Sequence, residues 1–139
     1  MAASPSPPPP AARQLCALLL GGILTLYGSL AVVPFYWLGI HRQPVESIHR
    51  GAFDPKRYAP FAYDGPGYWL HSVSVLLVYA TPVLTSGVVL ILAYLMVRQW
   101  QSSAWPSRLA SIGLVLLGLS ALWFLRSPTG RLIGVWHFD

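Results

Sequence analysis

Residues 68–97 read YWLHSVSVLLVYATPVLTSGVVLILAYLMV, and this stretch decides the fold class because it contains no charged side chain. A helix of this length would extend about 43 Å at 1.5 Å per residue. The hydrocarbon core of a bilayer is about 30 Å thick, so the stretch predicts a membrane-spanning helix. Pro82 predicts a kink near its middle, and the hydroxyls of Thr81 and Thr85 can satisfy the carbonyls that the proline leaves free.

Two further apolar segments flank this stretch. Residues 14–38 carry no charge and end in Phe35-Tyr36-Trp37, an aromatic group typical of a membrane interface. Residues 108–125 are bracketed by Arg108 and Arg126. Both segments predict spanning helices, and a cleaved signal peptide is the alternative for the first.

The composition agrees with this interpretation. The chain has 139 residues, of which 55% are apolar and 9% charged, against about 25% charged in soluble domains. A disordered regulator, a nucleic-acid-binding module and a small soluble enzyme are excluded, because none combines so little charge with so much apolar surface. The charged residues all lie outside the three segments or at their edges. We therefore expect an all-α, multi-pass integral membrane protein in the lipid bilayer, with three transmembrane helices and a folded extramembrane loop.

The connecting segments complete the expected organisation. Residues 1–13 form a Pro-rich disordered leader, residues 98–107 a short loop, and residues 126–139 an interfacial C-terminal tail. Three crossings place the N- and C-termini on opposite faces. The orientation stays open, because the loop between the first two helices carries more bases but is long.

Residues 39–67 are rich in aromatic and proline residues, which distinguishes them from a flexible linker. This loop and the tail predict either a surface for docking a partner subunit or a cap over the chain's own helix ends. The candidate docking residues are Phe53, Tyr58, Phe61, Tyr63, Trp136 and Phe138.

Two histidines are candidate cofactor ligands. His41 follows the first predicted helix, and His71 lies about one turn inside the second, so the two could reach a similar depth. Such a pair could ligate a haem, and a single imidazole could ligate a pigment. The alternative is an ordinary interfacial role for both side chains. No metal-ligand spacing and no catalytic motif accompany them, so we expect no metal site, no catalytic residue and most simply no cofactor.

Small residues recur at helical spacing within the predicted spans. Such stripes let helix backbones approach closely in lipid, either inside one chain or between subunits. The candidate helix-packing residues are Ala17, Gly21, Thr25, Ser29, Gly87, Ser111 and Gly118.

These features favour a small non-catalytic accessory subunit of a larger membrane protein complex, of the respiratory or photosynthetic electron-transfer type, with other membrane subunits as partners. Intramembrane chemistry usually requires ionisable groups within the spans, and here only His71 qualifies. The alternative is a haem- or pigment-ligating electron-transfer subunit that uses His71 and His41. A small transporter or assembly factor is a further alternative.

Overall fold

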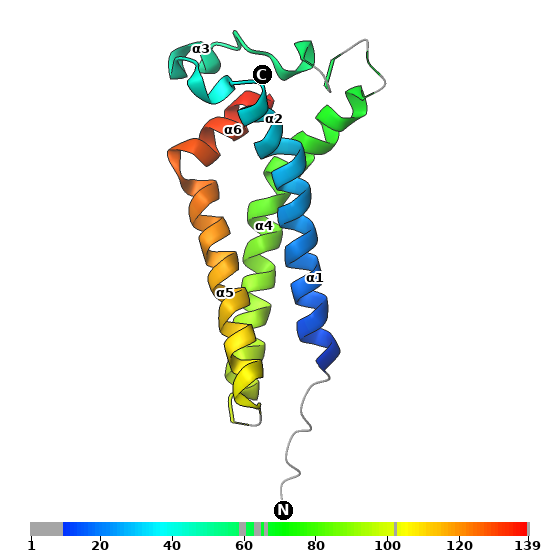
Figure 1. Ribbon diagram of the computed structural model, residues 1–139, viewed down its shortest axis with the longest axis vertical. Coiled ribbons are helices and arrows are strands. Elements are labelled where there is room, and N and C mark those ends of the chain that lie inside the picture. Colours follow the sequence, from blue (N-terminus) through cyan, green and yellow to red (C-terminus); the bar gives the residue numbers. More distant parts are fainter. Residues whose placement is uncertain (1–9, 59–60, 63–64, 66, 102, 139) are drawn as a thin grey trace, which may run out of the picture.

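Three long helices form the body of the molecule (Figure 1). The computed structural model describes residues 10–58, 61, 62, 65, 67–101 and 103–138, and within them every regular element is helical. The segments Ala11–Trp37, Tyr68–Gln99 and Trp105–Arg126 are each long and apolar enough to cross a membrane. The prediction of an all-helical chain with three such helices is confirmed.

The first long helix widens into a π-helical turn just before Pro34. It comprises α1 (Pro10–Tyr27), the π-helical turn η1 (Gly28–Val32) and α2 (Val33–Trp37). The N–H of Val33 donates to the carbonyl of Gly28, five residues earlier. Pro34 has no N–H to donate to the carbonyl four residues earlier. The wider π-helical turn η1 therefore lies where an α-helical hydrogen bond would be missing in any case. The sequence analysis expected an uninterrupted helix over 14–38.

The other two long helices begin and end close to the expected positions. Helix α4 covers Tyr68–Gln99, against an expected 68–97, and α5 covers Trp105–Arg126, against 108–125. Helix α4 stays helical through Pro82 and changes direction above its middle (Figure 1). Helix α5 starts earlier because Pro106 occupies its first turn, where a missing N–H costs nothing.

The described part of the segment between the first two long helices contains three short helices. These are η2 (Ile40–Arg42), α3 (Val45–His49) and η3 (Pro55–Arg57). Gly39 turns the chain out of α2 with a φ of 72°, a conformation that favours glycine. The Asp54 carboxylate then starts η3 by accepting from the Lys56 N–H at 2.9 Å.

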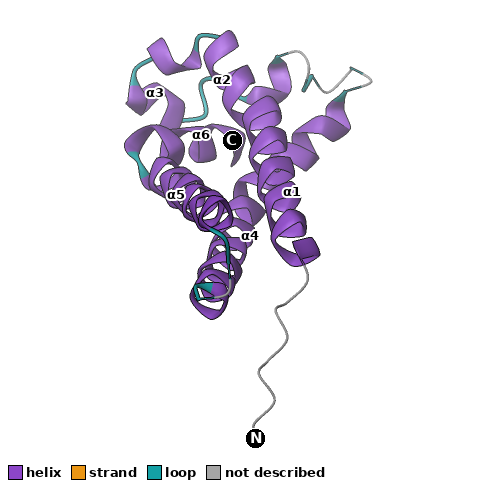
Figure 2. Cartoon of the chain, turned by 60° about the horizontal axis from the view of Figure 1, so that its bottom comes forward, coloured by secondary structure: helices purple, strands orange, loops and turns teal. Residues whose placement is uncertain are grey.

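The predicted tail forms an eleven-residue helix, α6 (Pro128–Phe138). Figure 2 shows α6 lying across the end of the bundle, inside a ring made by α2, α3 and the long helices. The reversal after Arg126 is tight, since Gly130 packs on the carbonyls of Phe124 and Leu125. The Ser127 hydroxyl accepts from the N–H of Gly130 at 3.2 Å and so caps the new helix.

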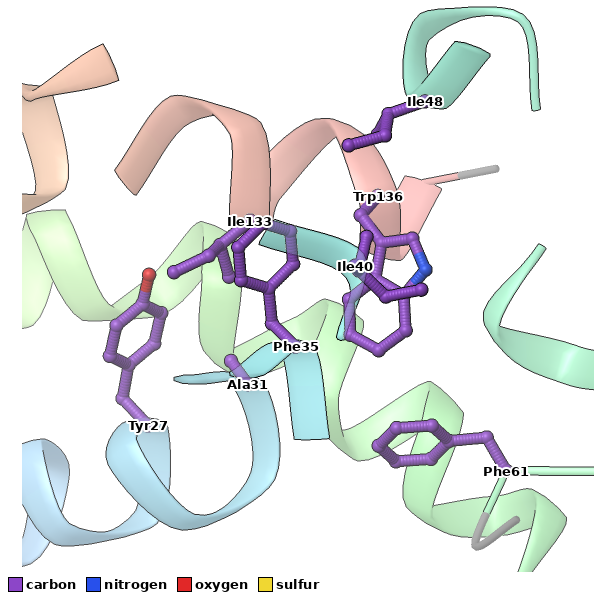
Figure 3. Close-up of a cluster of buried hydrophobic side chains, with 8 residues drawn as sticks. All are labelled: Tyr27, Ala31, Phe35, Ile40, Ile48, Phe61, Ile133 and Trp136. Carbon is purple, nitrogen blue, oxygen red and sulfur yellow. The ribbon is translucent and has the colours of Figure 1, made fainter. Parts of the chain in front are cut away.

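The largest core lies at this end of the molecule. It joins α1, η1, α2, the following loop and α6 (Figure 3), and its buried members are Tyr27, Ala31, Phe35, Ile40, Ile48, Phe61, Ile133 and Trp136. We call residues 40–58, Phe61 and α6 together the cap. A smaller core lies along α1 and α4, with Cys16, Leu20, Val88 and Leu92 buried. The chain is therefore packed most completely where the cap meets the helix ends.

The close approach at Gly130 provides a test of the cap. A Cβ at this position would overlap the Phe124 carbonyl oxygen and lie 2.8 Å from that of Leu125. We predict that Gly130→Ala lowers the free energy of unfolding in detergent by about 1–3 kcal/mol, the usual cost of overpacking.

Gly134→Ala is the matched control on the same helix. Its Cβ would make an ordinary 3.6 Å contact with Val78, so stability should be unchanged or slightly higher. Equal thermal unfolding of the two variants, followed by circular dichroism, would contradict the packing described for α6.

Candidate functional site

A small polar cluster lies where the cap meets α4. His71 and Ser74 stand one turn apart on α4, so they share a face of that helix. His137 comes from the last turn of α6. Ser74 and His137 are fully buried, and His71 is 8% exposed. Buried polar groups require partners, so the hydrogen bonds of this cluster determine what it can do.

His137 bridges two helices through its two ring nitrogens. Nδ1 lies 3.2 Å from the Ser74 hydroxyl, and Nε2 lies 3.5 Å from the carbonyl of Ala31 in η1. Ser74 donates its own proton to the His71 carbonyl at 2.8 Å. The Ser74 and Ala31 oxygens are then both acceptors, and a neutral imidazole has one N–H to offer. With that proton on Nε2, the ring donates to the Ala31 carbonyl, and the Ser74 hydroxyl can rotate away from the His71 carbonyl to donate to Nδ1.

Burial determines the charge of His137. Desolvation lowers the pKa of His137 from 6.5 to about 4, although the bond with the Ala31 carbonyl acts in the opposite direction. Positive charge on His71 would lower it slightly further. The ring is therefore neutral at pH 7 and serves as a hydrogen-bonding link between α6, α4 and η1.

Aromatic rings enclose this pair of histidines. The His71 and His137 rings lie 6.4 Å apart between centroids at an angle of 30°. Phe61 lies against both, at 6.1 Å from His71 and 5.7 Å from His137. The Trp136 ring lies 4.6 Å from that of His137. Phe61 thus fills the space beside both imidazoles.

The structure does not bring the two candidate haem ligands together. His41 is exposed, its ring lies 4.8 Å from that of Tyr36 at an angle of 37°, and Arg42 donates to its Nε2 at 3.3 Å. His71 instead neighbours His137, a pairing that the sequence analysis did not make. Nδ1 of His71 is buried without a hydrogen-bond partner among the described residues, so a single imidazole nitrogen is what this site offers. The described part of the chain contains no group of three metal-ligating side chains.

The candidate docking residues have different environments. Phe61 and Trp136 are fully buried in the cap core, so the chain itself covers both side chains. Phe53 and Tyr58 are half-buried. Phe138 is 44% exposed and lies 4.3 Å from the ring of Tyr79. Tyr63 lies outside the described residues.

The candidate helix-packing residues also divide into two groups. Gly118 of α5 is buried, and a Cβ there would overlap the side chain of Val89 on α4. Gly21, Thr25 and Ser29 of the first helix are exposed, and nothing lies within 4 Å of a Cβ built at Gly21. The remaining three, Ala17, Gly87 and Ser111, are half-buried.

Sequence reasoning missed the link between His71, Ser74 and His137. The available signal was a serine three residues after a histidine in a helix without Lys, Arg, Asp or Glu over residues 68–97, which places two polar groups on one face. No feature of the sequence near His71 and Ser74 indicated that the C-terminal tail would fold back and place His137 beside them.

No family model, curated protein or solved structure matches the chain. The functional argument therefore rests on the residues themselves.

The buried state of His137 predicts a pH dependence of stability. An unfolded chain takes up the proton as the pH falls below 6.5, whereas the folded chain resists it until about pH 4. The contribution of His137 to the free energy of unfolding is therefore complete above pH 6.5. It decreases as the pH falls toward 4, and about 2–3 kcal/mol of stability is lost by pH 4.5.

The measurement is the unfolding free energy in detergent at pH 7.5 and 4.5. His137→Gln retains a donor and an acceptor but does not titrate. Between pH 7.5 and 4.5 its unfolding free energy should therefore decrease by about 2–3 kcal/mol less than that of the native chain. His41→Gln, an exposed control, should keep the native decrease. An unchanged pH dependence in His137→Gln would show that His137 is not held neutral.

Proposed function

We propose that the chain is a non-catalytic accessory subunit, which spans a membrane three times and packs against a helix of a larger membrane protein complex. The observation that carries the proposal is the outward-facing stripe of small residues on the first long helix, at Gly21, Thr25 and Ser29. The cap and the surfaces of the long helices support it.

Membrane insertion is supported by the surfaces of the long helices. Their most apolar windows have mean hydropathies of 2.1, 2.3 and 1.9, yet only 22%, 28% and 6% of those windows is buried inside the chain. A soluble protein rarely leaves so large an apolar surface open to water. Lipid or other subunits would cover it, and three crossings would leave α6 and the start of α1 on opposite sides.

The exposed stripe is suited to a partner helix. The first long helix packs on α4 with Cys16, Leu20 and Tyr27, which lie on another face. The stripe presents only small side chains, and a Cβ at Gly21 or at Gly22 would meet open space. In lipid, such a surface lets two backbones approach closely enough for strong van der Waals packing.

The cap supports a structural role. The hydrogen bonds of His137 and Ser74 tie α6 to the helices beneath it. Aromatic rings surround both histidines, and these polar groups thereby stabilise one fold.

The proposal is tested by photo-crosslinking in native membranes. A photoreactive residue at Gly21 should give an adduct with one discrete membrane polypeptide, because this position would face the partner backbone. The same residue at Gly113 of α5 is the matched control, since that glycine is also exposed with nothing within 4 Å. It should give no such polypeptide adduct.

The assembled size is measured in parallel. Gly21→Leu should release the chain from a larger species on native electrophoresis, whereas Gly113→Leu should leave it there. The same adducts at both positions, or a native chain that migrates only as a monomer, would contradict the proposed function.

A further inference from the structure

A hollow lies where α5 ends and α6 passes beneath α3. Its volume is about 590 Å³, within the range of small-molecule sites. Three basic or titratable side chains and three aliphatic side chains line it: His49, Arg126, Arg131, Val45, Leu132 and Val135. The hollow therefore combines a polar rim with an apolar wall.

The ionisable side chains described in the lining of this hollow are all basic. Among the residues that the structure describes, no acidic side chain lines it. Arg126 and Arg131 are exposed, and neither takes part in the ion pair found among the described residues, which joins Lys56 to Asp54. The chain reversal at Pro128 brings both arginines to the lining of one cavity although they stand on different helices. Two guanidinium groups can bind the oxygens of a phosphate in a bidentate manner.

An apolar groove lies on the same helix, before Arg126. It has a volume of about 490 Å³ and is lined by Leu116, Leu119, Ser120, Trp123 and Phe124. The ten residue-to-residue steps from Leu116 to Arg126 rise about 15 Å along a helix. Trp123 is 76% exposed and stands one turn from the arginine, the arrangement that aromatic residues adopt at a membrane interface.

We propose that this hollow binds an anionic phospholipid, with the headgroup phosphate on Arg126 and Arg131 and one acyl chain along the groove of α5. The inference rests on the proposed membrane insertion, which would place the end of α5 at headgroup depth. Basic pockets at the ends of membrane helices bind anionic headgroups in this manner. A soluble phosphate would use the arginines but would leave the groove without an occupant.

The experiment measures lipid binding to the purified full chain in a neutral detergent by native mass spectrometry. The three probes are dioleoyl phosphatidylglycerol, dioleoyl phosphatidylcholine and glycerol 3-phosphate, which has the phosphate but no acyl chain. Each basic residue near an anionic lipid strengthens binding roughly fivefold, so two give on the order of 30-fold.

The native chain should bind phosphatidylglycerol about 30-fold more tightly than phosphatidylcholine, and glycerol 3-phosphate should not compete at equal concentration. Arg126→Gln/Arg131→Gln should lose this preference. Arg42→Gln/Arg57→Gln is the matched control, because it removes the same charge from exposed positions of the same cap that do not line the hollow. The control should bind like the native chain.

Three results would overturn the inference: equal affinity of the native chain for the two lipids, an equal loss in both double variants, or equally tight binding of glycerol 3-phosphate. The first comparison uses only the native chain and so does not depend on how the variants fold.

Alkaline extraction of native membranes separates this inference from the proposed function. If the chain is released at high pH, the proposed insertion is wrong whatever lipid binds in detergent. If the chain remains in the membrane but shows no lipid preference, the lipid site alone is wrong.

Discussion

The cap depends on one buried tryptophan. Trp136 is fully buried, and its Nε1–H donates to the Phe53 carbonyl at 2.7 Å, across 83 positions of sequence. Its ring packs edge-on against Phe35 at 5.7 Å and Phe61 at 6.3 Å. An indole buried without a partner for its N–H would be costly, so this bond and this packing fix α6 and the preceding loop in one arrangement. The positions of His137 and of the arginine-lined hollow follow from it.

The most extensive buried packing of the chain lies at one end of the molecule. The cap core joins segments from α1 to α6, whereas α5 packs along α4 with a single buried residue, Gly118. The approach of α5 to α4 at Gly118 requires the absence of a side chain opposite Val89. Because the cap holds the helices together at their ends, their sides remain free for lipid or for another subunit. This arrangement, together with the exposed stripe of small residues, supports the proposed accessory role.

The sequence predicted the features that depend on composition and on local chemistry. Charge-free segments indicated the three long helices, because a charged side chain in a buried or lipid-facing helix is costly. Arg126 indicated where the third helix ends, since it closes the charge-free segment. These features need no knowledge of what lies next to them in space.

The features that the sequence did not predict depend on tertiary contact. Gly21 and Gly118 belong to similar stripes of small residues, yet one is exposed and the other buried, because periodicity defines a face but not its neighbour. The tail's apolar residues were equally compatible with a membrane surface, and only Gly130, packed on the end of α5, lets the helix return over the bundle. That return sets His137, and not His41, beside His71.

The central claim is that Trp136 holds the cap together as one cooperative unit, and amide hydrogen exchange of the chain in detergent tests it most directly. Trp136→Leu removes the N–H and the ring. We predict that η2, α3 and α6 then lose protection together while α4 and α5 keep theirs, and that Trp123→Leu, at an exposed position, changes neither group. If Trp136→Leu raises exchange only in the last turn of α6, the cap is not a single unit and the account is contradicted.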